Sequence, residues 1–383
     1  MLPMLAYLDH HATTPCDPAV VAAMMPWWSE QCANPDSRLY RPALAAAAAI
    51  ELARQQLRQA LGAPAARVVW CSGATEANNL ALKGLAEAAL AAGTPRRRFV
   101  SVVSEHRAVL DPLRHLERHG FGLTLLPVGP TGLLEPAALA AALTPDVLAV
   151  SVMAANNEIG ALQPLAALAE LVHSAGALLH VDAAQAAGHI PLAMDDLGLD
   201  LLSLSGHKIY GPQGIGALLV RPQLSLAPQQ HGGAQQEGWR AGTLPVPLIV
   251  GLAAALQGAI ADREARAQRL GDLRDRLWEG LAALGGVSLN GPALDGPRLA
   301  HNLNVSLAGV EGTQLHQRLR RRIAVSSGSA CSQGSPSHVL RALGRSRTEA
   351  AASIRFGLGR GTSTADIELA VSAVAEAVQA LRL

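Results

Sequence analysis

Lysine is nearly absent from this 383-residue sequence, which contains 31 Lys and Arg residues but lysine only at Lys83 and Lys208. Arginine can replace lysine in most surface roles, but it cannot lose its charge and react as a primary amine. Lys208 lies in "SGHKIYGPQGIG", between a histidine and a Gly-Pro turn. Its retention there suggests a role that requires an amine.

Aromatic residues and net charge are also scarce. Phe, Trp and Tyr make up 3% of the chain, so Ala, Leu and Val must fill the core. The formal net charge of +1 provides no field that would gather nucleic acid or an acidic membrane surface. The short arginine runs "PRRRF" and "RLRRR" are typical of solvated surface. We therefore expect neither a nucleic-acid partner nor a membrane partner.

The four cysteines, Cys16, Cys32, Cys71 and Cys331, are far apart and form no CxxC pair. This pattern excludes a disulfide framework and a paired zinc site, and it indicates a reducing, cytoplasmic location. The N-terminus lacks the basic start and apolar run of a signal peptide. "HLERH" does not place its Glu as HExxH does, and "GPQGIG" is not GxGxxG, so metal and dinucleotide sites are not supported.

Apolar β runs alternate with helical segments through the first two thirds of the chain. "RVVWC", "RFVSVV", "VLAVSVM", "ALLHVDA" and "LLSLSG" are predicted strands, and most are separated by helices. This alternation predicts an α/β fold with a mostly parallel sheet that is covered on both faces. Helical pattern then dominates from Leu248 to Leu284 and leads to a smaller α/β region. We expect a large domain over 13–255 and a small domain formed by 1–12 and 256–383.

Five polar clusters follow these predicted strands directly. They are "CSGATE", "SEH", "NNEIG", "DAAQ" and "SGHK", and they contain Thr75, His106, Asn157, Asp182 and Lys208. Ligands of such sheets bind at the carboxyl ends of the strands. We therefore expect the five clusters to meet at one edge of the sheet and to form a ligand site.

The groups at this edge match the needs of pyridoxal phosphate (PLP), the common protein-bound aldehyde. A lysine can form a Schiff base with it, a carboxylate can keep its ring nitrogen protonated, and a helix N-terminus can bind its phosphate. Each residue alone also has a structural explanation, such as a helix cap or a surface lysine. The conjunction carries the inference, with these candidates: Lys208; Asp182; Ser72, Gly73, Ala74 and Thr75; Ser205 and His207; His106; Asn157 and Gln185.

On these residues the sequence resembles the cysteine desulfurases, PLP enzymes of aminotransferase class V and fold type I. The matching segments follow the family's order from Tyr7 to Arg360, almost the whole chain. The most specific are "SGHKIYGPQGIG" and "SSGSAC", which are similar to the branch that serves iron–sulfur cluster assembly. The other matches are "YLDHHATTP", "NPDS", "SGATEANN", "SEHRAVLD", "NNEIG", "HVDAAQ", "RAGTLPV", "VLRALG" and "SIRFGLGR".

The resemblance implies conversion of L-cysteine to L-alanine, with sulfane sulfur held as a persulfide, by a PLP-dependent homodimer with a seven-stranded type of sheet. It implies roles for individual positions: Lys208 as Schiff-base lysine; Asp182 on the ring nitrogen; His106 stacked on the ring; Asn157 and Gln185 as cofactor ligands; Ala74, Thr75, Ser205 and His207 at the phosphate, with Thr243 from a second subunit; Arg355 on the substrate carboxylate, with Asn34 and Asn157 nearby; Cys331 as nucleophile.

The sequence departs from the family pattern in three places. Tyr40 stands where relatives often have His, and the segment from Cys331 to "VLRALG" is shorter than in similar proteins. Relatives that dock an iron–sulfur scaffold also use a longer C-terminal tail than this chain, which stops at Leu383. The sulfur-acceptor protein therefore stays open between an iron–sulfur scaffold and another acceptor, and the choice between cysteine and selenocysteine stays open too.

Two other functions are consistent with the same fold. The first is a different PLP reaction, such as transamination or β-elimination, which would need no protein thiol such as Cys331. The second is an inactive paralogue that acts as a binding subunit, which would not need Lys208, Asp182, His106 and Cys331 together. A protein that stays colourless with added PLP would favour the paralogue.

The first prediction concerns Lys208. Lys208→Arg keeps the charge and approximate length of the side chain but removes the reactive primary amine. We expect the variant to fold and to lose the PLP adduct that borohydride fixes to the wild-type protein. Fixation of PLP to the variant, measured by mass spectrometry, would show that Lys208 is not the attachment site.

Overall fold

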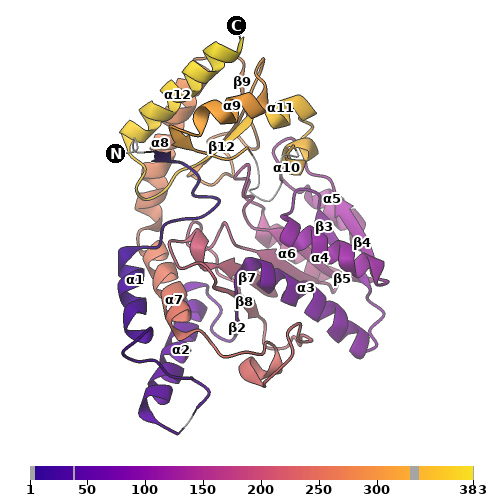
Figure 1. Cartoon of the computed structure of the whole chain (residues 1–383). Helices are drawn as coiled ribbons and strands as arrows, with labels where there is room; N and C mark the ends of the chain where they lie inside the picture. The colour runs from indigo at the N-terminus through magenta and orange to yellow at the C-terminus, as the bar shows by residue number, and fades with distance from the viewer. Residues whose placement is uncertain (1–4, 38, 328–335, 383) are drawn as a thin grey trace.

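The computed structural model describes residues 5–37, 39–327 and 336–382. Its centre is a seven-stranded sheet with the order β2-β8-β7-β6-β5-β3-β4 (Figure 1). Only β8 runs antiparallel to its two neighbours, so the predicted mostly parallel sheet is confirmed. The strands are β2 (Arg67–Cys71), β3 (Arg98–Val102), β4 (Gly122–Leu126), β5 (Val147–Met153), β6 (Leu178–Asp182), β7 (Leu201–Ser205) and β8 (Gly216–Val220).

Side chains of these strands alternate between two apolar cores, one on each face of the sheet. Trp70 faces a core that includes Leu57, whereas its neighbour Val69 faces a core that includes Leu80. This period of two places helices on both faces and leaves the strand ends free for polar groups. Residues of α2 (Arg41–Ala60), α6 (Leu165–Ser174) and α7 (Val246–Ala261) fill the first core, and those of α3 (Ala74–Ala91) and α4 (Arg107–Arg118) fill the second.

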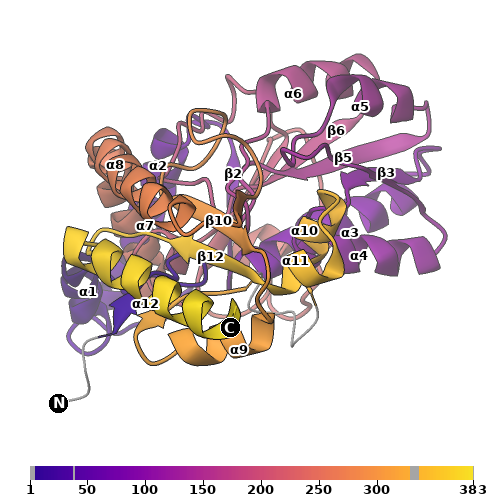
Figure 2. The ribbon, with the colours of Figure 1, turned by 90° about the horizontal axis from the view of Figure 1, so that it is seen from above.

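The C-terminal third of the chain forms a second set of elements with a core of its own. Strands β9 (Val287–Leu289), β10 (Asn302–Leu307) and β12 (Ser353–Gly357) form an antiparallel sheet in the order β12-β10-β9. Leu277, Phe356 and Val374 pack together in this core. Figure 2 shows α8 (Arg263–Ala282) and α12 (Thr364–Arg382) lying along this sheet.

Short elements complete the described fold. Strand β1 (Ala6–Tyr7) pairs in parallel with β11 (Ile323–Ala324), so the N-terminal segment joins the C-terminal elements. The remaining helices are α1 (Pro18–Met24), α5 (Pro136–Ala142), α9 (Gly312–Leu319), α10 (His338–Ala342) and α11 (Arg347–Ala351), with 3₁₀ turns η1 (Met25–Trp27), η2 (Gly206–Lys208) and η3 (Gln235–Gly238).

The predicted helical stretch from Leu248 to Leu284 is two helices. Helices α7 and α8 meet at Asp262 with a bend of 70°. Helix α7 is buried along most of its length because it packs against α1 and α2 and contributes to the first core. Among the described residues, no single helix is both long and apolar enough to cross a membrane; α7 and α8 pass that test only as a bent pair.

The second prediction tests the core between α2 and the sheet. Leu57 is fully buried in α2, whereas Leu52 on the same helix is 56% exposed. Leu57→Ala should lower the free energy of unfolding by about 2–5 kcal/mol, because it removes buried methyl groups and leaves a cavity. Leu52→Ala should change it by less than about 0.5 kcal/mol. Denaturant unfolding of both variants measures the difference, and equal effects would contradict this packing.

Candidate active site

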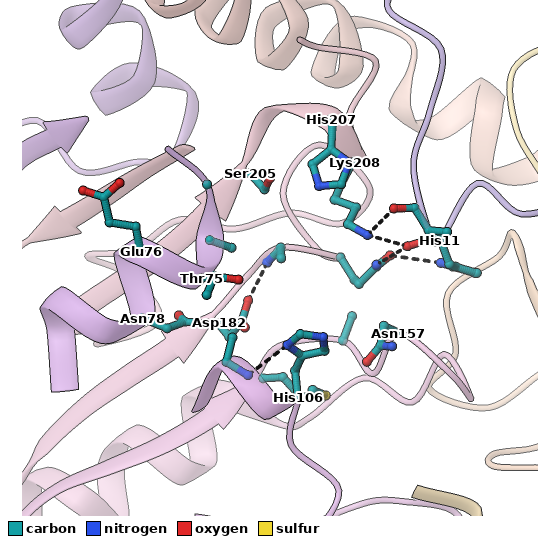
Figure 3. A pocket seen from close by; sticks show the side chains of 18 of the residues that line it. His11, Thr75, Glu76, Asn78, His106, Asn157, Asp182, Ser205, His207 and Lys208 are labelled. Atoms are coloured by element: carbon teal, nitrogen blue, oxygen red, sulfur yellow. Dashed lines mark hydrogen bonds between the residues drawn. The ribbon is translucent and has the colours of Figure 1, made fainter. Parts of the chain in front are cut away.

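A cavity of about 450 Å³ lies at the carboxyl ends of the central strands. The predicted polar clusters meet there, as expected for a mostly parallel sheet. Figure 3 shows Lys208 and His106 on opposite sides of the cavity, with Asp182, Thr75 and His11 around it. The cavity brings together these predicted residues: Ala74, Thr75, His106, Asn157, Asp182, Gln185, Ser205, His207, Lys208 and Arg355.

Lys208 ends the 3₁₀ turn η2, which follows β7 directly. Its Nζ donates hydrogen bonds to the backbone oxygens of His11, at 2.6 Å, and Ala12, at 2.7 Å. Both acceptors belong to the N-terminal segment, almost 200 residues away in the sequence. The amine is therefore fixed at the cavity wall by neutral acceptors.

The turn that carries Lys208 is closely packed against itself. A Cβ atom on Gly206 would lie 2.9 Å from the Pro212 oxygen, and one on Gly211 would lie 2.8 Å from the Gly206 oxygen. Tyr210 has a left-handed φ of 65°, which is strained for an aromatic residue. Its amide donates to Thr14 Oγ1 at 2.8 Å, and its hydroxyl accepts from the Arg360 amide at 2.7 Å. These contacts hold Lys208 in one position.

Asp182 ends β6 and is 5% exposed. Its Oδ1 accepts from the Ala184 amide at 2.9 Å, as a local cap would. Its Oδ2 accepts from Asn78 Nδ2 at 2.7 Å, so a side chain of α3 holds the second oxygen. Each oxygen of the carboxylate therefore accepts one hydrogen bond within the protein. A carboxylate in this position could keep the ring nitrogen of PLP protonated.

His106 begins α4 as its N-cap residue, because its Nδ1 accepts from the Ala108 amide at 3.1 Å. When the ring is neutral, this bond leaves the proton on Nε2. Burial lowers the pKa of His106, although the negative charge of Asp182 opposes that shift. His106 therefore caps a helix and also lines the cavity.

The first turn of α3 forms part of the cavity wall. Ala74 and Thr75 are its first two residues, where backbone N–H groups lack intrahelical partners. Ser205 and His207 line the same cavity. Burial, followed by the charge of Lys208, lowers the pKa of His207 to about 4, so its ring is neutral and can donate or accept a hydrogen bond. These groups could hold a phosphate.

His11 is a cavity residue that sequence reasoning missed. Gln185 holds it twice: its Oε1 pairs with His11 Nδ1 at 3.0 Å, and its Nε2 donates to the His11 oxygen at 2.9 Å. His11 Nε2 also pairs with Asn302 Nδ2 at 3.1 Å. Burial lowers the pKa of His11 well below its usual value. The sequence gives no local signal for this contact, since His11 and Gln185 are 174 positions apart in the chain.

Arg355 enters the cavity from β12 and is 1% exposed. Its Nη2 donates to Asp9 Oδ1 at 2.8 Å, and its Nη1 donates to the Asn157 backbone oxygen at 3.1 Å. Nε has no hydrogen-bond partner among the residues that the structure describes. A buried guanidinium with donor capacity to spare suits an incoming carboxylate.

Two predicted site residues of the described chain do not line this cavity. Asn34 and Thr243 are exposed and lie outside it. Asn34 Oδ1 instead accepts from the Asp36 amide at 3.0 Å. Tyr40, which replaces the family's frequent His, is also exposed. Cys331 lies outside the described residues.

Asn78 is a second residue that the sequence analysis missed, although a signal was available. It lies four residues after Ala74 and three after Thr75, so it shares their face of α3. That spacing could have predicted a polar side chain beside the strand ends. Its partner on β6 could not have been identified from spacing alone.

Sequence comparison places the chain in a family. The profile described as "Aminotransferase class-V" matches residues 6–369. The chain belongs to the aminotransferase class-V family. It is 44% identical to the protein named cysteine desulfurase IscS of Dechloromonas aromatica (strain RCB), over 98% of this chain and 93% of that protein. A cysteine desulfurase IscS of Methylococcus capsulatus is 45% identical over the same shares.

A solved structure shares the fold of this class-V chain. A structure titled "NIFS-LIKE PROTEIN" superposes with a TM-score of 0.91 at 32% identity, covering 99% of this chain and 100% of that one. The predicted fold class, a mixed α/β fold of PLP fold type I, is therefore confirmed.

The third prediction concerns the Arg355–Asp9 pair. Asp9→Asn leaves the buried guanidinium without its anionic partner and should lower the free energy of unfolding by about 2 kcal/mol. Asp17→Asn is the matched control, because Asp17 pairs with the more exposed Arg360 and Asn can keep its N-cap role. Asp17→Asn should lower the free energy of unfolding by less than about 1 kcal/mol. Chemical denaturation of both variants measures this, and a larger loss for Asp17→Asn would contradict it.

Proposed function

We propose that this protein is a PLP-dependent cysteine desulfurase that converts L-cysteine to L-alanine and holds the sulfur as a persulfide on Cys331. One observation carries the proposal: Lys208, Asp182 and Arg355 line a single cavity in a chain that is similar along 98% of its length to proteins named cysteine desulfurase. An amine, a carboxylate and a guanidinium are the three charged groups that an amino-acid substrate and its cofactor require.

The cavity fits pyridoxal phosphate by the chemistry of its donors. Asp182 would hold the ring nitrogen, and the first turn of α3 with Ser205 and His207 would hold the phosphate. His106 would lie against the ring, and Asn157 and Gln185 would donate to its phenolic oxygen. When bound, the group supplies an aldehyde for amines and a protonated ring that withdraws electrons. The volume of about 450 Å³ accommodates a small cofactor with its substrate.

Arg355, Lys208 and Cys331 would each have a different role toward the substrate. Arg355 would bind the carboxylate of L-cysteine through guanidinium N–H groups, and Asn157 would help to orient it. Lys208, once its Nζ is free, would take the proton from Cα. The Cys331 thiolate would attack the substrate sulfur, so an S–S bond forms while the substrate C–S bond breaks. A proton delivered to the remaining fragment gives L-alanine.

The described residues on either side of Cys331 lie beside the cavity. Ser326 Oγ donates to Asp9 Oδ2 at 2.9 Å, and Asp9 contacts Arg355. On the other side, Ser337 Oγ donates to the Glu158 carboxylate. Glu158 follows Asn157, which lines the cavity. These two hydrogen bonds hold the flanking residues close to cavity residues, which supports the proposal that the Cys331 thiolate reaches the substrate.

A homodimer is part of this proposal. Thr243 is exposed on its own chain, so it is available to bind the phosphate of a partner's site. Several large apolar side chains are also exposed between residues 21 and 44, where an interface would cover them. They are Val21, Met25, Trp28, Leu39, Tyr40 and Leu44.

We also propose the two domains predicted from the sequence, 13–255 and 1–12 with 256–383. The separate cores around Leu57 and Phe356 support this division. Leu299, Val339 and Leu340 pack with the first core, so the contact between the domains involves part of the C-terminal region. The substrate cavity would lie between them, because Arg355 comes from one and Lys208 from the other.

The acceptor of the sulfur is a protein, either an iron–sulfur scaffold or another sulfur-transfer partner. The similarity to proteins named IscS supports the first. The short segment after Cys331 leaves the second open. The cytoplasmic location that we propose rests on the free thiols of Cys16, Cys32 and Cys71.

The fourth prediction tests the reaction itself. Cys331→Ser should still bind PLP and L-cysteine but form no persulfide, because serine cannot accept the sulfane sulfur. Alanine production should fall by on the order of a thousandfold or more, as for loss of a nucleophile. Mass spectrometry after a pulse of L-cysteine should find the added sulfur on the Cys331 peptide of the wild type.

Cys32→Ser and Cys71→Ser are the matched controls for exposed and buried thiols. Both should keep the rate of alanine formation within about twofold. If Cys331→Ser still transferred sulfur at the normal rate, a β-elimination reaction without a protein thiol would replace the desulfurase mechanism. A wild-type protein that bound no PLP would instead support the inactive paralogue.

A further inference from the structure

A second buried carboxyl group, that of Glu105, takes no part in the mechanism above. Glu105 precedes His106 and is fully buried, with 0% of its surface exposed. Its Oε1 accepts from the Met153 amide at 2.6 Å. Its Oε2 has no hydrogen-bond partner anywhere in the described parts of the chain. A buried carboxylate with one neutral donor and one unpaired oxygen would be very costly as an anion.

The end of β5 links Glu105 to Asp182. Successive amides of that strand bind the two residues: the Met153 amide donates to Glu105, and the Ala154 amide donates to the Asp182 backbone oxygen at 2.9 Å. Met153 also pairs with Asp182 across β5 and β6, and it lines the cavity. Any change at Glu105 therefore acts on the strand ends that position Asp182.

The two carboxyl groups have unequal surroundings. Asp182 accepts from Asn78 Nδ2 and from the Ala184 amide, whereas Glu105 accepts from one amide only. Two carboxyl groups that are close in a poorly hydrated site do not both ionise, and the better-solvated one keeps the charge. Burial, followed by the charge of Asp182, raises the pKa of Glu105 well above its usual value.

We propose that Glu105 is a positioning residue that stays protonated in the folded enzyme, so that Asp182 alone carries the negative charge facing the cofactor's ring nitrogen. In this role Glu105 accepts the hydrogen bond of the Met153 amide and so positions the end of β5. Because it is neutral, it adds no second negative charge beside Asp182. The titratable groups around it are Asp182 on β6, His106 on α4, and His338 on α10, whose Nε2 pairs with the Glu105 backbone oxygen at 2.9 Å. The part that concerns the cofactor rests on the proposed function.

Glu105→Gln distinguishes a protonated from an ionised residue, because Gln is a neutral isostere that still accepts from the Met153 amide. If Glu105 is protonated when folded and ionised when unfolded, the wild type loses stability relative to Glu105→Gln as pH rises. The melting temperature of the variant holoenzyme should exceed that of the wild type by a gap that grows by about 2 °C per pH unit between pH 5 and 8.

Glu117→Gln on α4 is the matched control, since Glu117 is exposed. The difference in melting temperature between Glu117→Gln and the wild type should stay constant over the same pH range. A constant or shrinking gap for Glu105→Gln would overturn the assignment of the proton. This measurement requires no turnover of L-cysteine, so it can fail or succeed independently of the proposed desulfurase reaction.

The visible absorbance of bound PLP gives the second measurement. Exchange of a protonated acid for an amide should leave the pH midpoint of the band within about 0.3 unit of the wild type. Removal of a negative charge beside Asp182 would shift the midpoint by about one unit or more, and such a shift would overturn the proposal. Asp182→Asn provides the positive control for a shift.

Glu105→Leu tests the positioning role, because it removes the acceptor of the Met153 amide. We expect its dissociation constant for PLP to rise about tenfold or more, the effect of one lost hydrogen bond to a buried donor. Glu105→Gln should restore the wild-type value. Glu105→Leu with unchanged PLP affinity would overturn the positioning role. If the Leu variant failed to fold, the Gln measurements would still decide the assignment of the proton.

Discussion

The two hydrogen bonds from the Lys208 ammonium to His11 and Ala12 organise the whole cavity. They bring the N-terminal segment to the carboxyl edge of the central sheet. Gln185, in the segment after β6, and Asn302, the first residue of β10, each bind His11 through their side chains. Asp9, two residues earlier, then pairs with Arg355. One amine thus connects the sheet, the N-terminus and the C-terminal elements.

The carboxylate of Asp182 and the guanidinium of Arg355 reach the cavity from different sheets. Asp182 lies at the end of a central strand and is held by α3, whereas Arg355 comes from the second sheet. Burial keeps the rings of His106, His207 and His11 neutral, so they add hydrogen bonds without adding charge. The acidic and basic groups of the cavity therefore come from different elements of the fold.

Local sequence patterns were sufficient for the central sheet and for residues at its strand ends. The strand ending at Asp182 and the turn at Lys208 were predictable, because a short apolar run precedes each polar cluster. Contacts between distant segments were not predictable: His11 has no local signal, and the break at Asp262 lies inside a continuous helical pattern. Arg355 was identified only through family resemblance, since β12 was not predicted as a strand.

The antiparallel direction of β8 has a consequence for altering this protein. Because β7 and β8 run in opposite directions, a connection of ten residues joins them, and part of it lines the cavity. Gly206 and Gly211 leave no room for side chains inside that connection. Side chains added there would displace Lys208. The N-terminal segment and the first turn of α3 are the walls where new side chains could reshape the cavity independently.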